Sequence, residues 1–97
     1  MKVFDLKEME LEEKAKVFYS VDEFNTRLID LPAGGKIPTC DMDSYVLFYV
    51  VDGKVMVTVD GGEKKLDEGD CLVTEPAALS LKTEEGAKIL GIQISKM

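Results

Sequence analysis

A cysteine and a methionine alternate with two aspartates in the middle of the chain, in the run Cys40-Asp41-Met42-Asp43. A thiolate and a thioether are soft ligands of the kind that copper(I) selects, and Cys71 carries the only other thiol that could join them. A catalytic cysteine usually needs a neighbouring base, and the chain contains no histidine, so a Cys–His pair is excluded. We weigh a soft metal site against an ordinary cysteine packed as a small hydrophobe, and the sequence favours the second interpretation.

Two charged residues could bind or transform an organic molecule. Arg27 is the only arginine, and its planar guanidinium suits a ligand carboxylate or phosphate if its strand face is turned inward. Glu75 stands beside Pro76 in a predicted turn, and a partly buried glutamate there could act as a general acid or base. The alternatives are an outward arginine that pairs with surface acids and an exposed turn glutamate, and the sequence leaves them open.

The elements that position these residues are predicted to be short β-strands. Asp52-Gly53 and Asp60-Gly61-Gly62 have the residue types of tight hairpin turns. Residues 6–16 are mostly charged, and this composition predicts a brief helical turn or solvated chain. This pattern is typical of an all-β sandwich or barrel and predicts one domain over residues 1–97. The predicted strands cover residues 16–20, 25–31, 45–51, 54–60, 63–66, 71–74, 80–83 and 87–94.

The glycine spacing resembles the first of the two sequence motifs of the cupin β-barrels. Gly34 opens this motif, and Gly53 closes it after an apolar strand. The two histidine positions of the motif are occupied by Cys40 and Met42, and its glutamate position by Val46. The resemblance therefore implies that three metal-ligand positions of the family are replaced here.

The second motif is matched in the same way, and with the strands before it the resemblance covers residues 16–94. Gly69 opens this motif, Glu75 takes its proline position, Ala77 its glycine position and Ser80 its histidine position. The resemblance implies a double-stranded β-helix, or jelly-roll, barrel. Because all four ligand positions are replaced, we expect no metal and no cofactor.

Strand alternation places Val50 and the residues at the replaced positions inside such a barrel. We predict that a small organic molecule binds there, in a metal-free interior, through Arg27, Cys40, Met42, Val46, Phe48, Glu75 and Ser80. A first alternative is a metal-independent isomerase, epimerase or lyase that uses Glu75 or a tyrosine. A second is a structural or interaction domain whose barrel is filled by core side chains such as Met42, Val46 and Phe48.

Composition limits the partners. A net charge of −7 disfavours nucleic acid and anionic membranes, because both attract basic surfaces. Two cysteines cannot form a multi-bridge framework, which favours reduced thiols and a cytoplasmic protein. Tyr45 and Tyr49 share the strand face opposite Val46 and Phe48 and could meet a second copy, and the resemblance also implies a homodimer.

Overall fold

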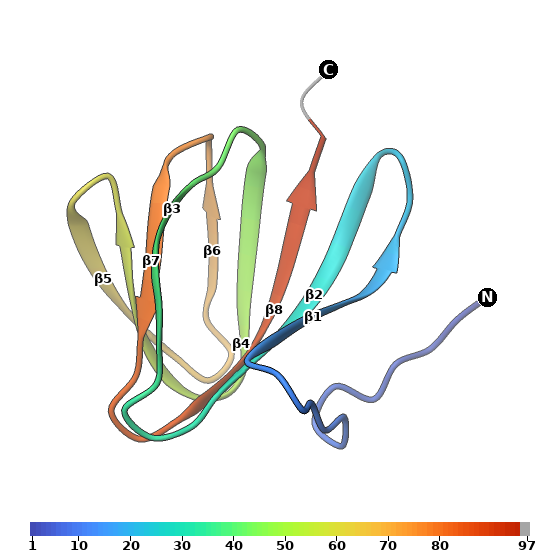
Figure 1. Cartoon of the computed structure of the whole chain (residues 1–97), viewed down its shortest axis with the longest axis horizontal. Coiled ribbons are helices and arrows are strands. Elements are labelled where there is room, and N and C mark those ends of the chain that lie inside the picture. The colour runs from blue at the N-terminus through green and yellow to red at the C-terminus, as the bar shows by residue number, and fades with distance from the viewer. Residues whose placement is uncertain (96–97) are drawn as a thin grey trace.

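The computed structural model describes residues 1–95 of the 97-residue chain and confirms the all-β prediction (Figure 1). In the described part, no helix has the length and apolar character needed to cross a membrane. The strands are β1 (Ala15–Ser20), β2 (Phe24–Leu31), β3 (Lys36–Asp41), β4 (Tyr45–Val59), β5 (Gly62–Asp67), β6 (Cys71–Thr74), β7 (Ala78–Lys82) and β8 (Ala87–Ile94).

The long strand β4 joins the two halves of the curled sheet. Its first half pairs with β6 and β8, and its second half pairs with β5 and β7. The path across the sheet is β1-β2-β8-β4-β7-β3, and all pairs are antiparallel. Figure 1 shows how this strand bends, so that the two halves of the sheet face each other across the interior.

The prediction of a hairpin turn at Asp52-Gly53 is wrong, because the chain continues as one bent strand. A register shift between Val50 and Asp52 marks a β-bulge at this corner, and Gly53 has a φ of 84°. A bulge bends a strand without ending it, and glycine tolerates positive φ in either setting. The second predicted turn is confirmed: Val59 pairs with Gly62 across Asp60 (φ 47°) and Gly61 (φ 85°).

Strand β3 was not predicted from the sequence. It contains Pro38, which cannot donate a backbone hydrogen bond, and its register with β7 shifts between Ile37 and Cys40. Proline and a bulge are tolerated here because β3 ends the path across the sheet. This irregular edge strand carries the Cys40 position into the barrel wall.

The core lies on the concave side of the sheet. Alternation along β4 buries Val46, Phe48 and Val50 and, beyond the bend, Val55 and Val57. These side chains join one buried cluster with residues of β2, β5, β7 and β8, among them Ile29, Leu66, Leu79, Leu81 and Ile89.

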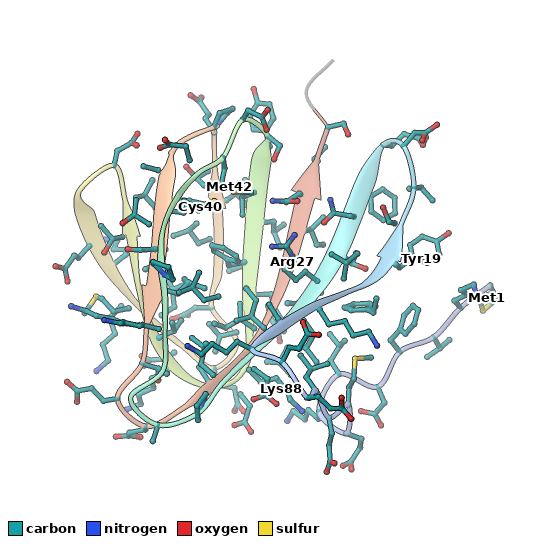
Figure 2. The ribbon with its side chains drawn as sticks, viewed as in Figure 1. Met1, Tyr19, Arg27, Cys40, Met42 and Lys88 are labelled. Carbon is teal, nitrogen blue, oxygen red and sulfur yellow. The ribbon has the colours of Figure 1, made fainter. Side chains whose placement is uncertain are left out.

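The N-terminal segment is attached to the outside of the sheet by Lys88. The Lys88 Nζ donates to the carbonyl oxygens of Lys7 and Met9, at 2.8 Å each. Met9 N donates to the carbonyl of Asp5 at 3.0 Å, which closes a single helical turn. Figure 2 labels Lys88 beside this segment. Of the two predicted alternatives, a brief helical turn and solvated chain, the structure has the turn.

Candidate functional site

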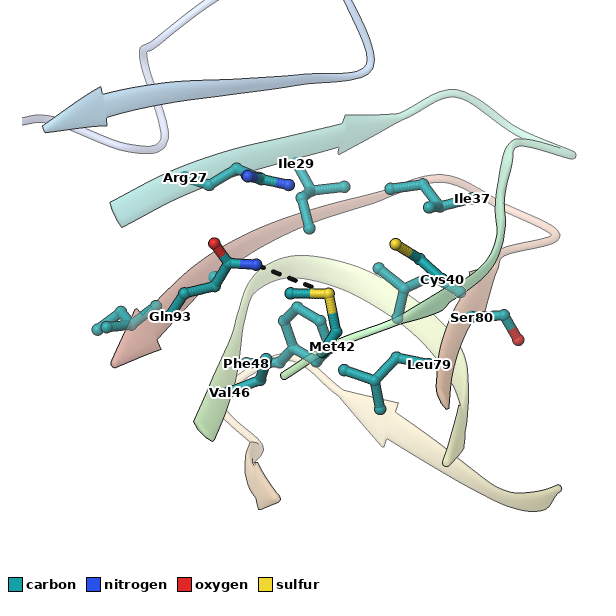
Figure 3. Close-up of a pocket in the computed structure, with 13 residues that line it drawn as sticks. Arg27, Ile29, Ile37, Cys40, Met42, Val46, Phe48, Leu79, Ser80 and Gln93 are labelled. Carbon is teal, nitrogen blue, oxygen red and sulfur yellow. Dashed lines mark hydrogen bonds between the residues drawn. The ribbon is translucent and has the colours of Figure 1, made fainter. Parts of the chain in front are cut away.

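A cavity of about 140 Å³ lies between the two halves of the sheet (Figure 3). Its wall is largely apolar, as is usual for small-ligand pockets. Strands β2, β3, β4, β7 and β8 contribute to it, so residues far apart in sequence meet there. The apolar wall includes Ile29, Ile37, Val46, Phe48, Leu79 and Leu81, and the polar or sulfur-bearing groups belong to Arg27, Cys40, Met42, Ser80 and Gln93.

Six of the seven predicted ligand-binding residues line this cavity: Arg27, Cys40, Met42, Val46, Phe48 and Ser80. Arg27 projects from β2 beside Ile29 and lines the cavity (Figures 2 and 3). Of the two alternatives that the sequence left open, the inward orientation is therefore the one found. Val46 and Phe48 belong both to the core cluster and to the cavity wall. The interior is therefore packed in part and still holds a cavity.

The placement of Ser80 and Glu75 differs from the prediction. Ser80 pairs with Thr58 between two buried neighbours, Leu79 and Leu81, and Figure 3 shows its hydroxyl pointing away from the cavity. The main chain of Ser80, and not its side chain, therefore lines the cavity, because alternation along β7 turns the side chains of Leu79 and Leu81 inward. Glu75 is exposed in the segment between β6 and β7, outside the set of residues that line the cavity.

The two cysteines lie on opposite faces of the sheet. Cys40 is paired with the inward-facing Leu79 and lines the cavity, whereas Cys71 is paired with the exposed Tyr49. Both are free thiols with exposed side chains. The hypothesis of a copper(I) site that uses both cysteines is therefore wrong, because their side chains cannot bind the same ion.

The residues at the replaced motif positions do not fit a metal centre. Val46 has no donor atom, the Ser80 hydroxyl points outward, and the Met42 sulfur accepts a hydrogen bond from Gln93 Nε2 at 3.7 Å. Among residues 1–95, no group of three or more His, Cys, Asp or Glu side chains is placed to hold an ion.

A short polar network orients the amide of Gln93. Asn25 Nδ2 donates to Gln93 Oε1 at 3.0 Å, so the Gln93 oxygen is used and its NH₂ group faces Met42 and the cavity. In the described residues, neither bond of this network uses the Arg27 guanidinium. The cavity therefore offers two nitrogen donors, from Arg27 and Gln93, to a ligand acceptor.

The sequence interpretation missed part of this network. Neither Gln93 nor Asn25 is among the predicted ligand-binding residues. Period-two alternation with Arg27 and Ile29 was the available signal for Asn25. Only the register of β2 with β8, in which Asn25 faces Gln93, shows that the two amides meet.

Gly91 provides the room for Phe48 in the cavity wall. A Cβ at this position would lie 3.4 Å from Phe48 Cε1 and 3.7 Å from Ile29 Cδ1. The Phe48 ring therefore packs against the main chain of β8. This close packing gives one wall of the cavity its flat aromatic surface.

The outer face of the same half of the sheet is apolar and exposed. Cross-strand register brings Tyr45 opposite Ile94, and Ile94 opposite Phe24; Leu47 faces Val73. The exposed fractions are 43% for Tyr45, 38% for Tyr49, 67% for Val73 and 43% for Ile94. This apolar outer face is defined by Phe24, Tyr45, Leu47, Tyr49, Val73, Ile92 and Ile94; of these seven residues, only Ile92 also lines the cavity.

No protein-family model matches the sequence, and no curated protein matches it by sequence. Solved structures match it well. The cupin domain of Cnp3 from Schizosaccharomyces pombe superposes with a TM-score of 0.83 at 18% identity, over 97% of this chain and 74% of that one. An RmlC-like cupin from Shewanella frigidimarina gives a TM-score of 0.80 at 20% identity, over 93% of this chain and 86% of that one.

Part of a larger enzyme has the same fold. Salicylate 1,2-dioxygenase from Pseudoaminobacter salicylatoxidans, in its adduct with gentisate, gives a TM-score of 0.76 at 20% identity. The match covers 82% of this chain and only 24% of the dioxygenase.

Proposed function

The chain has the all-β jelly-roll fold of the cupins, and on this premise we propose that it binds a small carboxylic acid with an apolar body inside the cavity. The observation that carries the proposal is the combination of an apolar wall with the Arg27 and Gln93 donors. A carboxylate accepts charge-assisted hydrogen bonds from a guanidinium, often two in parallel. The apolar wall would then hold the hydrocarbon part of the same molecule.

The size of the cavity supports an acid with a body of about one ring. An apolar cavity of about 150 Å³ in another protein accommodates benzene, and the volume here is about 140 Å³. The structure of the dioxygenase neighbour is an adduct with gentisate, an aromatic hydroxy acid. For this chain the aromatic acids are probes chosen for their shape and charge.

The proposal includes a metal-free cavity in a cytoplasmic protein. It is supported by the side chains at the replaced positions, which include one valine and one outward serine, and by the two free thiols. Elemental analysis of protein purified without tags or chelators should find less than stoichiometric metal. A tightly held, stoichiometric metal ion would contradict this part of the proposal.

Isothermal titration calorimetry and amide NMR spectra with benzoate, salicylate and gentisate test the acid site. We expect benzoate to bind at least tenfold more tightly than benzamide, its neutral counterpart, because only the acid can form an ion pair with Arg27. The perturbed amides should belong to residues that line the cavity. Equal affinities for benzoate and benzamide, or shifts confined to other surfaces, would refute the proposal.

A second function, in homodimer contact, is favoured by the apolar outer face. The outward positions of β4, β6 and β8 there are Tyr45, Leu47, Tyr49, Cys71, Val73, Leu90, Ile92 and Ile94, and none of them carries a charge. Two copies of a chain of net charge −7 repel each other, and an uncharged face lets them approach with the least repulsion. We therefore propose that a second copy of this chain covers the face.

Replacing Val73 by lysine together with Tyr49 by alanine should weaken the dimer by about 30-fold or more, because a central interface side chain can contribute about 2 kcal/mol. Sedimentation velocity over a range of protein concentrations measures the change. The control Thr58→Lys adds a charge on the opposite half of the sheet and should leave the dimer intact. A wild-type protein that stays monomeric at high concentration would disprove the homodimer.

A further inference from the structure

A second hollow, of about 460 Å³, lies on the outside of the other half of the sheet. It is formed where the β2–β3 and β7–β8 turns meet the second half of β4 and strand β5, and it shares no lining residue with the barrel cavity. Four lysines line it: Lys36, Lys54, Lys65 and Lys82. This basic groove stands out on a chain whose net charge is −7.

Strand register arranges three of the lysines in one row across four strands. Lys36 on β3 is directly opposite Lys82 on β7, and Lys82 is opposite Met56 on β4. Met56 is in turn opposite Lys65 on β5. Like charges directly opposite each other destabilise an antiparallel pair, so the Lys36–Lys82 pair gains from an anion placed between the two ammonium groups.

Acidic residues near the groove do not remove its positive charge. Lys54 is opposite Asp67 across the strand pair and so has a carboxylate neighbour. Glu84 and Glu85 line the groove on the side of the β7–β8 turn. Lys82 ends β7 directly before that turn, so the glutamates lie at the Lys82 end of the groove. The four lysines that line the groove outnumber these two glutamates, and its lining keeps a net positive charge.

The frame of the groove is held by hydrogen bonds from several segments. Thr83 is only 6% exposed, and its Oγ1 donates to the carbonyl of Lys54 at 2.6 Å and accepts from Gly86 N at 3.0 Å. Its main-chain N donates to the carbonyl of Gly35 at 3.0 Å. A frame of this kind is already ordered before a ligand arrives, which lowers the entropic cost of binding.

The spacing of the lysines indicates the class of ligand. Neighbouring strands lie about 4.8 Å apart, so the main-chain positions of Lys36 and Lys65 are roughly 14 Å apart across the sheet. One phosphate can contact one or two of these flexible ammonium groups, whereas a chain of phosphates can contact all three. We propose that the basic groove binds the oligophosphate group of a small molecule.

Calorimetric titration at low ionic strength with inorganic phosphate, tripolyphosphate and ATP tests this proposal. Tripolyphosphate should bind at least tenfold more tightly than inorganic phosphate, and physiological salt should weaken its binding because salt screens exposed charges. An ATP affinity equal to that of tripolyphosphate would show that the groove recognises the phosphates alone. A higher ATP affinity would show that the nucleoside contributes further contacts. The absence of tripolyphosphate binding by the wild-type protein would overturn the proposal.

Lysine substitutions distinguish tripolyphosphate binding in this groove from non-specific attraction to other lysines on the surface. Lys36→Gln combined with Lys82→Gln should weaken tripolyphosphate binding by about tenfold; Lys65→Gln alone should weaken it less. Lys16→Gln, on the exposed β1 edge outside the groove, is the matched control and should change nothing. An equal loss in Lys16→Gln would identify non-specific attraction and overturn the proposal. Benzoate binding in the cavity should be unchanged in all three variants.

Discussion

Replacing Gly53 by alanine is expected to lower the free energy of unfolding by about 3 to 5 kcal/mol. Gly53 has a φ of 84°, and a Cβ there would lie 2.2 Å from the carbonyl oxygen of Gly86 and 3.0 Å from the Cα of Ala87. These are main-chain atoms of the segment that enters β8, so no flexible side chain can move aside. Because a small domain has about 5 to 15 kcal/mol of stability in total, the variant should unfold at much lower urea concentration.

Gly61→Ala is the matched control for this experiment. Its φ is 85°, almost the same, but no atom lies within 4 Å of the added Cβ. It should therefore cost only the backbone strain, about 1 to 2 kcal/mol. Urea unfolding followed by circular dichroism measures both variants. Equal losses would mean that strain alone explains Gly53 and that the close approach to Gly86 has no energetic importance.

Replacing Arg27 by methionine should weaken benzoate binding by about 30-fold or more. Methionine keeps an unbranched, largely apolar side chain in the wall but removes the positive charge that the proposed carboxylate would meet. Losing one partner of a desolvated charge pair typically costs about 2 to 5 kcal/mol, which corresponds to this loss of affinity. Titration calorimetry of the variant against benzoate and benzamide measures the effect.

The affinity for neutral benzamide should change little in Arg27→Met, because benzamide has no charge to lose. Arg27→Lys should bind benzoate with intermediate affinity, since lysine keeps the charge without the planar pair of donors. Glu75→Gln is the control, because Glu75 is exposed and does not line the cavity. An Arg27→Met variant that binds benzoate as tightly as the wild type would show that the carboxylate is not held by Arg27.

Local chemistry explains why much of the fold could be predicted. Alternation along a strand is a property of neighbouring residues, so the faces of β4 could be assigned before any pairing was known. The residue types of Asp60-Gly61 suit positive φ, and a hairpin turn is found there. The glycine spacing likewise pointed to the cupin fold even though the side chains at the ligand positions differ.

Asp52-Gly53 shows where local chemistry is ambiguous. A glycine with positive φ serves equally in a tight turn and in a bend of a continuous strand. Which of the two forms depends on the partners that each half of the segment finds, and these lie between residues 62 and 94. A short-range pattern contains no information about those partners.

The sequence by itself determined the class of fold, the inward face of β4 and six of the thirteen residues that line the cavity. Only the tertiary structure decided that Ser80 meets the cavity with its main chain, that Cys40 and Cys71 lie on opposite faces, and that Asn25 orients Gln93. The lysine row joins residues 36, 82, 56 and 65 in the same way. The reason is that cross-strand register is set by pairing between distant segments, whereas alternation is set within a single strand.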